Sequence, residues 1–130
     1  MGTRRALVVA NDEYRDPGLQ SLRSPATDAA ALAEVLGDPD IGQFDLNVVR
    51  NANVQELREQ LDRFFGTASR EDELLVHFSC HGLKDDSGEL YLAATNTTPT
   101  RWATAVDAAT VGRFMRRSRA RQIVLFLDCC

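Results

Sequence analysis

LLVHFSCHG, residues Leu74–Gly82, is a short apolar run that closes on a histidine and a glycine. The acidic segment Glu71–Glu73 precedes it, and the glycine that follows is a turn residue. A run of this length, too short for a helix and bounded on both sides, is typical of a buried strand in a parallel sheet. We therefore expect His81 to lie at the carboxyl end of a central strand.

A second apolar run, IVLFL at residues 123–127, ends in a similar way and is followed by Asp128, Cys129 and Cys130. Open α/β sheets place their functional sites outside the carboxyl ends of the strands. If the two strands are parallel neighbours, the imidazole of His81 and the thiol of Cys130 come together at one edge of the sheet. The two runs thus predict a histidine–cysteine pair.

Strand and helix patterns alternate along the rest of the chain. We expect further strands at residues 5–10 and 45–50, helices at 24–37, 53–65 and 107–118, a small extension strand at 90–92, a polar turn at 83–88 and a loop at 95–104. This alternation predicts βαβ units and a mainly parallel sheet in one α/β domain that spans residues 1–130.

The composition suits a globular domain with a hydrophobic core, because 44% of the 130 residues are hydrophobic and 26% are charged. A net charge of −4 argues against a general attraction to nucleic acid or to an anionic membrane. Three cysteines make a poor disulfide framework, which favours a cytoplasmic location. The chain stops directly after a core strand, so we expect it to be the N-terminal part of a larger fold.

A cysteine nucleophile needs a base that takes its proton and donors that stabilise the developing oxyanion. His81 fits the role of the base, and the backbone N–H groups of Gly82 and Cys130 fit the role of the donors. Spacing alone also agrees with an ordinary pair of core residues, since buried cysteines and histidines are common. We expect His77, on the same strand, to be a core histidine with satisfied hydrogen bonds.

The motif HFSCHG at residues 77–82, followed by LFLDCC at 125–130, resembles the caspase-like cysteine peptidases, especially metacaspases, paracaspases and their bacterial relatives. In that family one strand ends in a Ser-x-His-Gly motif and the next core strand ends in Asp-x-Cys. The similarity extends to residues 6–10, 22–29 and 88–97, and so covers essentially the whole chain. It implies a caspase-like three-layer sandwich with a mainly parallel central sheet, here truncated after the fourth core strand.

The resemblance implies that His81 is the general base and Cys130 the nucleophile of a cysteine endopeptidase. Cys129 fills the variable position between the aspartate and the nucleophile, and we expect it to be a small buried side chain. Cys80 stands where the family often has glycine. We expect it to serve in packing, although its closeness to His81 also makes it a candidate for oxidation.

Substrate preference follows from two further positions of the resemblance. Asp128 stands where caspases proper usually have glutamine, and Asp28 matches a second aspartate of metacaspases and paracaspases. Two carboxylates in the P1 pocket favour an arginine or lysine side chain. Arg23 keeps cleavage after aspartate open as an alternative, because caspases proper place a pocket arginine near that position.

The chemistry of this family needs no cofactor, and the spacing of cysteines and histidines predicts no metal site. Some metacaspases need calcium, and Asp85 and Asp86 could bind it, although two acids in a turn are more often solvated. The partners that we expect are a protein or peptide substrate and the C-terminal part of the same fold. A regulated role in defence or cell death follows by analogy, and a non-catalytic caspase-like interaction module is the alternative.

Overall fold

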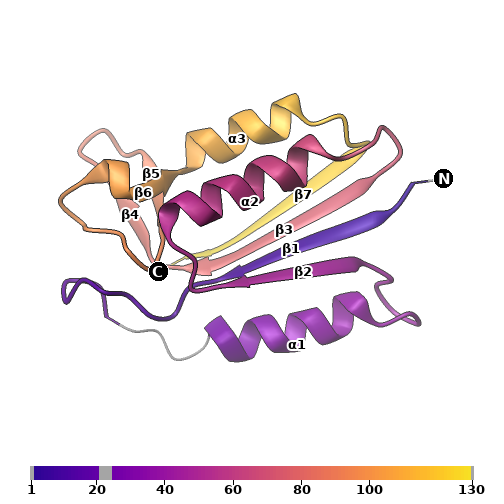
Figure 1. The fold of residues 1–130 in the computed structure, drawn as a ribbon, viewed down its shortest axis with the longest axis horizontal. Coiled ribbons are helices and arrows are strands. Elements are labelled where there is room, and N and C mark those ends of the chain that lie inside the picture. The colour runs from indigo at the N-terminus through magenta and orange to yellow at the C-terminus, as the bar shows by residue number, and fades with distance from the viewer. Residues whose placement is uncertain (1, 21–24, 130) are drawn as a thin grey trace.

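A four-stranded parallel sheet forms the centre of the computed structural model, which describes residues 2–20 and 25–129, without the side chains of residues 25–27. The strands lie in the order β2-β1-β3-β7. One helix, α1, covers one face of this sheet, and two helices, α2 and α3, cover the other (Figure 1). The bounds of these elements are Arg4–Ala10 for β1, Pro25–Gly37 for α1, Asp45–Arg50 for β2, Val54–Gly66 for α2, Glu73–Cys80 for β3, Ala108–Arg117 for α3 and Gln122–Cys129 for β7.

The predicted α/β class and the alternation of strand and helix are confirmed. The strand expected at 45–50 has the predicted bounds, whereas those expected at 5–10 and 123–127 are one and three residues longer, because strand pairing continues into the polar residues at their ends. Ser24, the first residue of the helix expected at 24–37, lies outside the described residues. Asn53, the first residue of the helix expected at 53–65, caps α2: its side chain accepts a hydrogen bond from the backbone N–H of Glu56 at 2.8 Å.

The larger core lies between the sheet and the pair α2 and α3. The apolar stripe of α2 supplies four buried side chains, at helical spacing on one face. They pack with buried residues of β1, β3 and α3; the main members of this core are Leu7, Val9, Leu57, Leu61, Phe64, Phe65, Leu74, Val76, Phe78 and Val111. Burial of this stripe is what holds α2 against the sheet.

The opposite face of the sheet is only partly covered. There, α1 packs on β1 through a small cluster that includes Val8, Ala29 and Leu36. The edge strand β7 keeps apolar side chains in solvent on this face, with Phe126 52% exposed and Val124 36% exposed. These two residues are two positions apart, so their side chains are exposed on the same face of β7.

A small antiparallel sheet, in the order β4-β5-β6, lies at the carboxyl ends of the main strands (Figure 1). Its strands are β4 (Gly82–Lys84), β5 (Leu90–Ala93) and β6 (Ala105–Asp107). The expected polar turn at 83–88 was therefore wrong at its start, and the expected loop at 95–104 contains a 3-10 helix at Trp102–Thr104. The short strands β4 and β6 each pair with β5 through backbone contacts. At three residues each, they are too short to show an apolar periodicity in the sequence.

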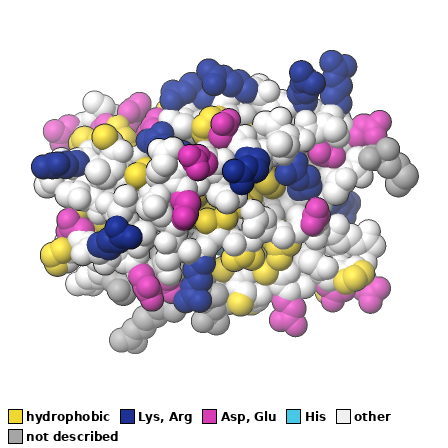
Figure 2. All heavy atoms as spheres, viewed as in Figure 1, with side chains coloured by type: hydrophobic (Ala, Val, Ile, Leu, Met, Phe, Trp, Pro, Cys, Tyr) yellow, Lys and Arg dark blue, Asp and Glu magenta, His cyan; other side chains and the backbone are white. Residues whose placement is uncertain are grey.

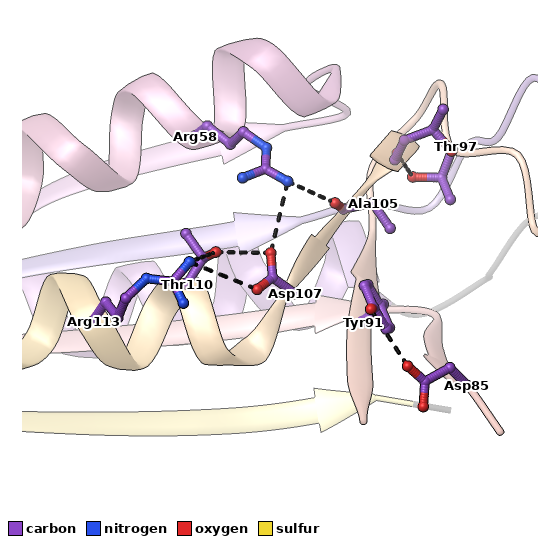
Figure 3. Close-up of polar contacts among 9 residues, drawn as sticks. Arg58, Asp85, Tyr91, Thr97, Ala105, Asp107, Thr110 and Arg113 are labelled. Carbon is purple, nitrogen blue, oxygen red and sulfur yellow. Dashed lines mark hydrogen bonds and ion pairs between the residues drawn. The ribbon is translucent and has the colours of Figure 1, made fainter. Parts of the chain in front are cut away.

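Asp107 joins this small sheet to α2 and α3 (Figure 3). The hydroxyl of Thr110 donates a hydrogen bond to its carboxylate at 2.7 Å, and the guanidinium groups of Arg58 and Arg113 lie 3.7 and 4.0 Å from it. Partial burial alone would raise the pKa of Asp107, but the Thr110 hydroxyl and Arg58 hold it below its usual value. Asp107 precedes α3 as expected, although its side chain makes no capping bond to the helix backbone.

The surface carries both charge signs. Figure 2 shows acidic and basic side chains interspersed over the viewed face, with basic ones grouped along its upper edge, over α3. Within the described part of the chain, no helix has the length and apolar character needed to cross a membrane.

Candidate active site

His81 follows directly after β3 and its backbone is held on both sides. Its N–H donates a hydrogen bond to the phenolic oxygen of Tyr14 at 2.9 Å, and its carbonyl accepts one from the N–H of Ala93 at 2.9 Å. The Tyr14 hydroxyl in turn donates to the carbonyl oxygen of Asn11 at 2.8 Å. The loop after β1 and the strand β5 thus fix the position of the histidine at the edge of the sheet.

The imidazole of His81 has a defined tautomer. Its Nε2 atom lies 2.7 Å from the carbonyl oxygen of Gln20. A carbonyl oxygen can only accept a hydrogen bond, so Nε2 carries the hydrogen and, in the neutral ring, Nδ1 carries the lone pair. This is the arrangement of a base that acts through Nδ1, with the carbonyl of Gln20 orienting the ring.

Tyr14 also contacts the His81 ring, with 4.9 Å between ring centroids and a tilt of 50°. Burial raises the pKa of Tyr14 well above its usual value, so the hydroxyl stays protonated and keeps its bond to Asn11. Sequence reasoning missed both Tyr14 and Gln20. The available signal was their place in the loop after β1, whose carboxyl end shares the sheet edge with that of β3.

The strand β7 pairs with β3 in parallel, as predicted, with Ser79 opposite Asp128 and Cys80 opposite Cys129. His81 and Cys130 follow these last paired residues. Cys130 itself lies outside the described residues, so its contact with His81 remains a prediction. The register supports that prediction, because each residue comes one position after a directly paired neighbour.

The thiols of Cys80 and Cys129 lie within hydrogen-bond distance, with 3.8 Å between their Sγ atoms. This hydrogen bond lowers the pKa of the Cys129 thiol, although burial and the charge of Asp128 oppose the shift. Cys80 is buried in the larger core, as expected, whereas Cys129 is half-buried rather than fully enclosed.

A groove of about 430 Å³ lies on the α1 side of the sheet. Asp28, in the first turn of α1, is exposed and lines it together with Leu32, Leu36, Leu75, His77 and Phe126. Side chains alternate along a strand, so Asp128 lies on the same face of β7 as Phe126, two residues further along. Asp128 is exposed. Asp28 on α1 and Asp128 on β7 therefore both lie on the α1 side of the sheet, although only Asp28 lines the groove.

His77 contradicts the expectation of a satisfied core histidine. It is half-buried and lines the groove, and its Nδ1 atom is buried with no hydrogen-bond partner among the described residues. The alternation that buries its neighbours Val76 and Phe78 in the larger core turns His77 to the thinly covered face instead.

The remaining predicted residues lie around His81. Gly82 begins β4, is half-buried and pairs with Leu92. The carboxylate of Asp85 accepts hydrogen bonds from the backbone N–H groups of Ser87 and Glu89, at 2.9 and 3.0 Å, and so stabilises its own turn. In the ranges that the structure describes, no group of three or more His, Cys, Asp or Glu side chains is arranged to hold a metal ion.

Comparison with known proteins adds a family and a fold. The family model described as caspase domain matches residues 3–130. The structure is also similar to the crystal structure of protein GSU0716 from Geobacter sulfurreducens, with a TM-score of 0.76 and 14% sequence identity. The match covers 98% of this chain and 50% of that one, so this chain spans half the length of the other. No curated protein matches the chain.

Proposed function

The chain belongs to the caspase domain family of peptidases, and we propose that it is the N-terminal, large part of a cysteine endopeptidase. The observation that carries this proposal is the register of β3 and β7. It pairs Cys80 with Cys129 and so aligns the strand ends that lead into His81 and Cys130.

In the proposed mechanism, the thiolate of Cys130 attacks the scissile carbonyl carbon of a peptide bond. His81 takes the thiol proton at Nδ1 and passes it to the leaving amine, while Gln20 holds the hydrogen on Nε2. The backbone N–H groups of Gly82 and Cys130 stabilise the oxyanion. Water then hydrolyses the acyl-enzyme thioester and restores the thiol.

We assign the preference for arginine or lysine before the scissile bond to Asp28 and Asp128. Support comes from their shared face of the sheet and from the groove that Asp28 lines, whose other walls are mainly apolar. Such walls fit the aliphatic part of an arginine or lysine side chain, and a carboxylate fits its cationic end. A substrate aspartate in the same pocket would instead face the carboxylates of Asp28 and Asp128, which carry the same charge as its own side chain.

The remaining part of the fold is the partner that this proposal requires. The exposed apolar side chains of Val124 and Leu127, which do not line the groove, support a packing surface on β7 for that part. The match to only half of the Geobacter sulfurreducens chain agrees with such an arrangement. We place the enzyme in the cytoplasm, acting on protein or peptide substrates under a regulatory signal, with calcium as a candidate activator.

The decisive experiment compares the full-length protein with its Cys130→Ala variant. Both receive fluorogenic peptides that end in arginine, lysine or aspartate, with and without calcium. We expect cleavage after arginine or lysine that the variant loses by at least about a thousandfold, because the nucleophile is gone. Equal activity of the variant would refute the role of Cys130. If both proteins are inactive and the Cys130 thiol of the unmodified protein is alkylated no faster than an ordinary thiol, the result favours a non-catalytic caspase-like interaction module.

Specificity is tested separately with Asp28→Asn and Asp128→Asn, and with Asp62→Asn on the exposed side of α2 as a matched control. We expect each pocket variant to raise the KM for arginine peptides at least about tenfold, the size of one lost charged contact. The control should leave KM unchanged. Cleavage after aspartate by the unmodified protein would keep the enzyme and overturn the pocket assignment.

A further inference from the structure

Two thiols outside the proposed dyad form a pair of their own. Cys80 is the last residue of β3 and Cys129 the last of β7, and the two are directly opposite in the parallel register. Their Sγ atoms lie 3.8 Å apart. The proposed mechanism uses neither of them.

We propose that Cys80 and Cys129 form a site of reversible oxidation that closes to an intramolecular disulfide under hydrogen peroxide. Neighbouring strands lie about 4.8 Å apart, within the range of Cα separations that a disulfide spans. The sulfurs must approach from 3.8 Å to about 2 Å, so the two side chains must turn toward each other.

The environment assigns a role to each thiol. The hydrogen bond from Cys80 favours the thiolate of Cys129, whose pKa is lowered. Cys129 is half-buried, whereas Cys80 is buried in the core. Cys129 is therefore the thiol that peroxide reaches first, and Cys80 is the resolving thiol.

The chemistry balances in two steps. The Cys129 thiolate attacks one peroxide oxygen, the O–O bond breaks, and after protonation the products are the sulfenic acid of Cys129 and one water molecule. The Cys80 sulfur then attacks the Cys129 sulfur, forms the S–S bond and displaces hydroxide, which takes the Cys80 proton to give a second water. Two thiols lose two electrons in total, and the peroxide gains them.

This inference goes beyond the proposed function, and its test does not require a measurement of peptidase activity. The test uses the full-length Cys130→Ala protein, which lacks the third thiol of residues 1–130. This protein is treated with hydrogen peroxide, alkylated and then digested with trypsin. Cleavage after Arg70, Lys84 and Arg121 separates the peptide 71–84, with Cys80, from the peptide that starts at Gln122, with Cys129. We expect a cross-linked pair that is 2 Da lighter than the sum of the two peptides and that a thiol reductant separates.

The matched control is Cys80→Ser in the same Cys130→Ala background, with folding checked by circular dichroism. Without the resolving thiol, the sulfenic acid of Cys129 should accumulate, and labelling by dimedone at this residue should rise at least about fivefold. A cross-link between two copies of the protein, or oxidation of Cys129 to sulfinic acid while Cys80 stays alkylatable, would overturn the proposal. So would two thiols that both remain reduced.

Discussion

At the scale of single residues, the organisation of the site depends on Tyr14. One hydroxyl accepts from the backbone of His81 and donates to the carbonyl of Asn11, while the ring rests against the imidazole. These three contacts fix the histidine through its backbone and its ring at once. The Gln20 carbonyl completes the arrangement by selecting the tautomer.

Replacing Tyr14 by phenylalanine tests this positioning role, because it removes the hydroxyl and keeps the ring. The N–H of His81 loses its acceptor, so we expect kcat for an arginine peptide to fall about tenfold, corresponding to about 1.4 kcal/mol. KM should change little, since Tyr14 does not belong to the P1 groove. Steady-state kinetics on the full-length protein measure both constants.

Tyr91→Phe is the control for this variant. Its hydroxyl lies 3.4 Å from a carboxylate oxygen of Asp85 (Figure 3). It should keep the kcat of the unmodified protein. A Tyr14→Phe enzyme with unchanged kcat, or with a change confined to KM, would contradict the positioning role.

At the scale of elements, Asp107 links three of them. It ends β6, precedes α3 and lies near Arg58 of α2, whose guanidinium also donates to the carbonyl of Ala105 at 3.0 Å. Because β6 pairs with β5, and β5 holds the backbone carbonyl of His81, this link supports the small sheet beside the site.

We expect Asp107→Asn to lower the free energy of unfolding at pH 7 by about 1–2 kcal/mol, because a partly buried charged acceptor is lost. The pKa of Asp107 in the fold lies below its usual value of 3.8. Its stabilisation is therefore complete at pH values above the unfolded-state pKa and is lost as the pH falls through the lower pKa of the folded state.

Urea unfolding of the unmodified protein and of Asp107→Asn, at pH 7 and at steps down to pH 3, measures this dependence. The difference between the two proteins should shrink as the pH falls. Asp62→Asn, on the exposed face of α2, serves as control and should change stability by less than about 0.5 kcal/mol. A difference that grows toward low pH would show that the carboxylate does not stabilise the fold.

At the scale of the whole molecule, the two faces of the sheet differ. Two helices and the larger core cover one face, and α1 alone packs on the other. Phe126 and Val124 remain exposed on β7, which is an edge strand of the described sheet. We attribute the exposure of Val124 to a further part of the fold that packs on β7 beside the groove, whose wall includes Phe126.

We therefore expect residues 1–130 produced alone to show no cleavage of arginine peptides, while the full-length protein cleaves them. The isolated segment should also bind the dye 8-anilinonaphthalene-1-sulfonate through its exposed apolar face. Phe126→Ser should weaken that binding at least about twofold. The exposed Val48→Ser on β2, at the opposite edge of the sheet, should weaken it less. Turnover by the segment equal to that of the full-length protein would refute this interpretation.

The sequence by itself determined the α/β class, the four core strands and the candidate roles of His81 and Cys130. Apolar periodicity reports burial locally, and a short apolar run that ends in a polar residue marks the functional edge of a parallel sheet. The P1 assignment of Asp28 came from family resemblance, and only the fold puts Asp28 in a groove. The exposure of His77 to that groove could not be predicted from the sequence of its strand. The apolar pattern of a strand does not show which helices cover each face of the sheet.

Only the tertiary structure decided the contacts of Tyr14 and Gln20 with His81 and the approach of Cys80 to Cys129. These contacts join residues that are far apart in the chain, so no local pattern encodes them. They depend on the strand order, the register and the path of the loop after β1, which are set together when the helices pack on the sheet. That is the physical reason why the sequence could suggest His81 and Cys130 as candidates, while the residues that orient His81 appeared only in the fold.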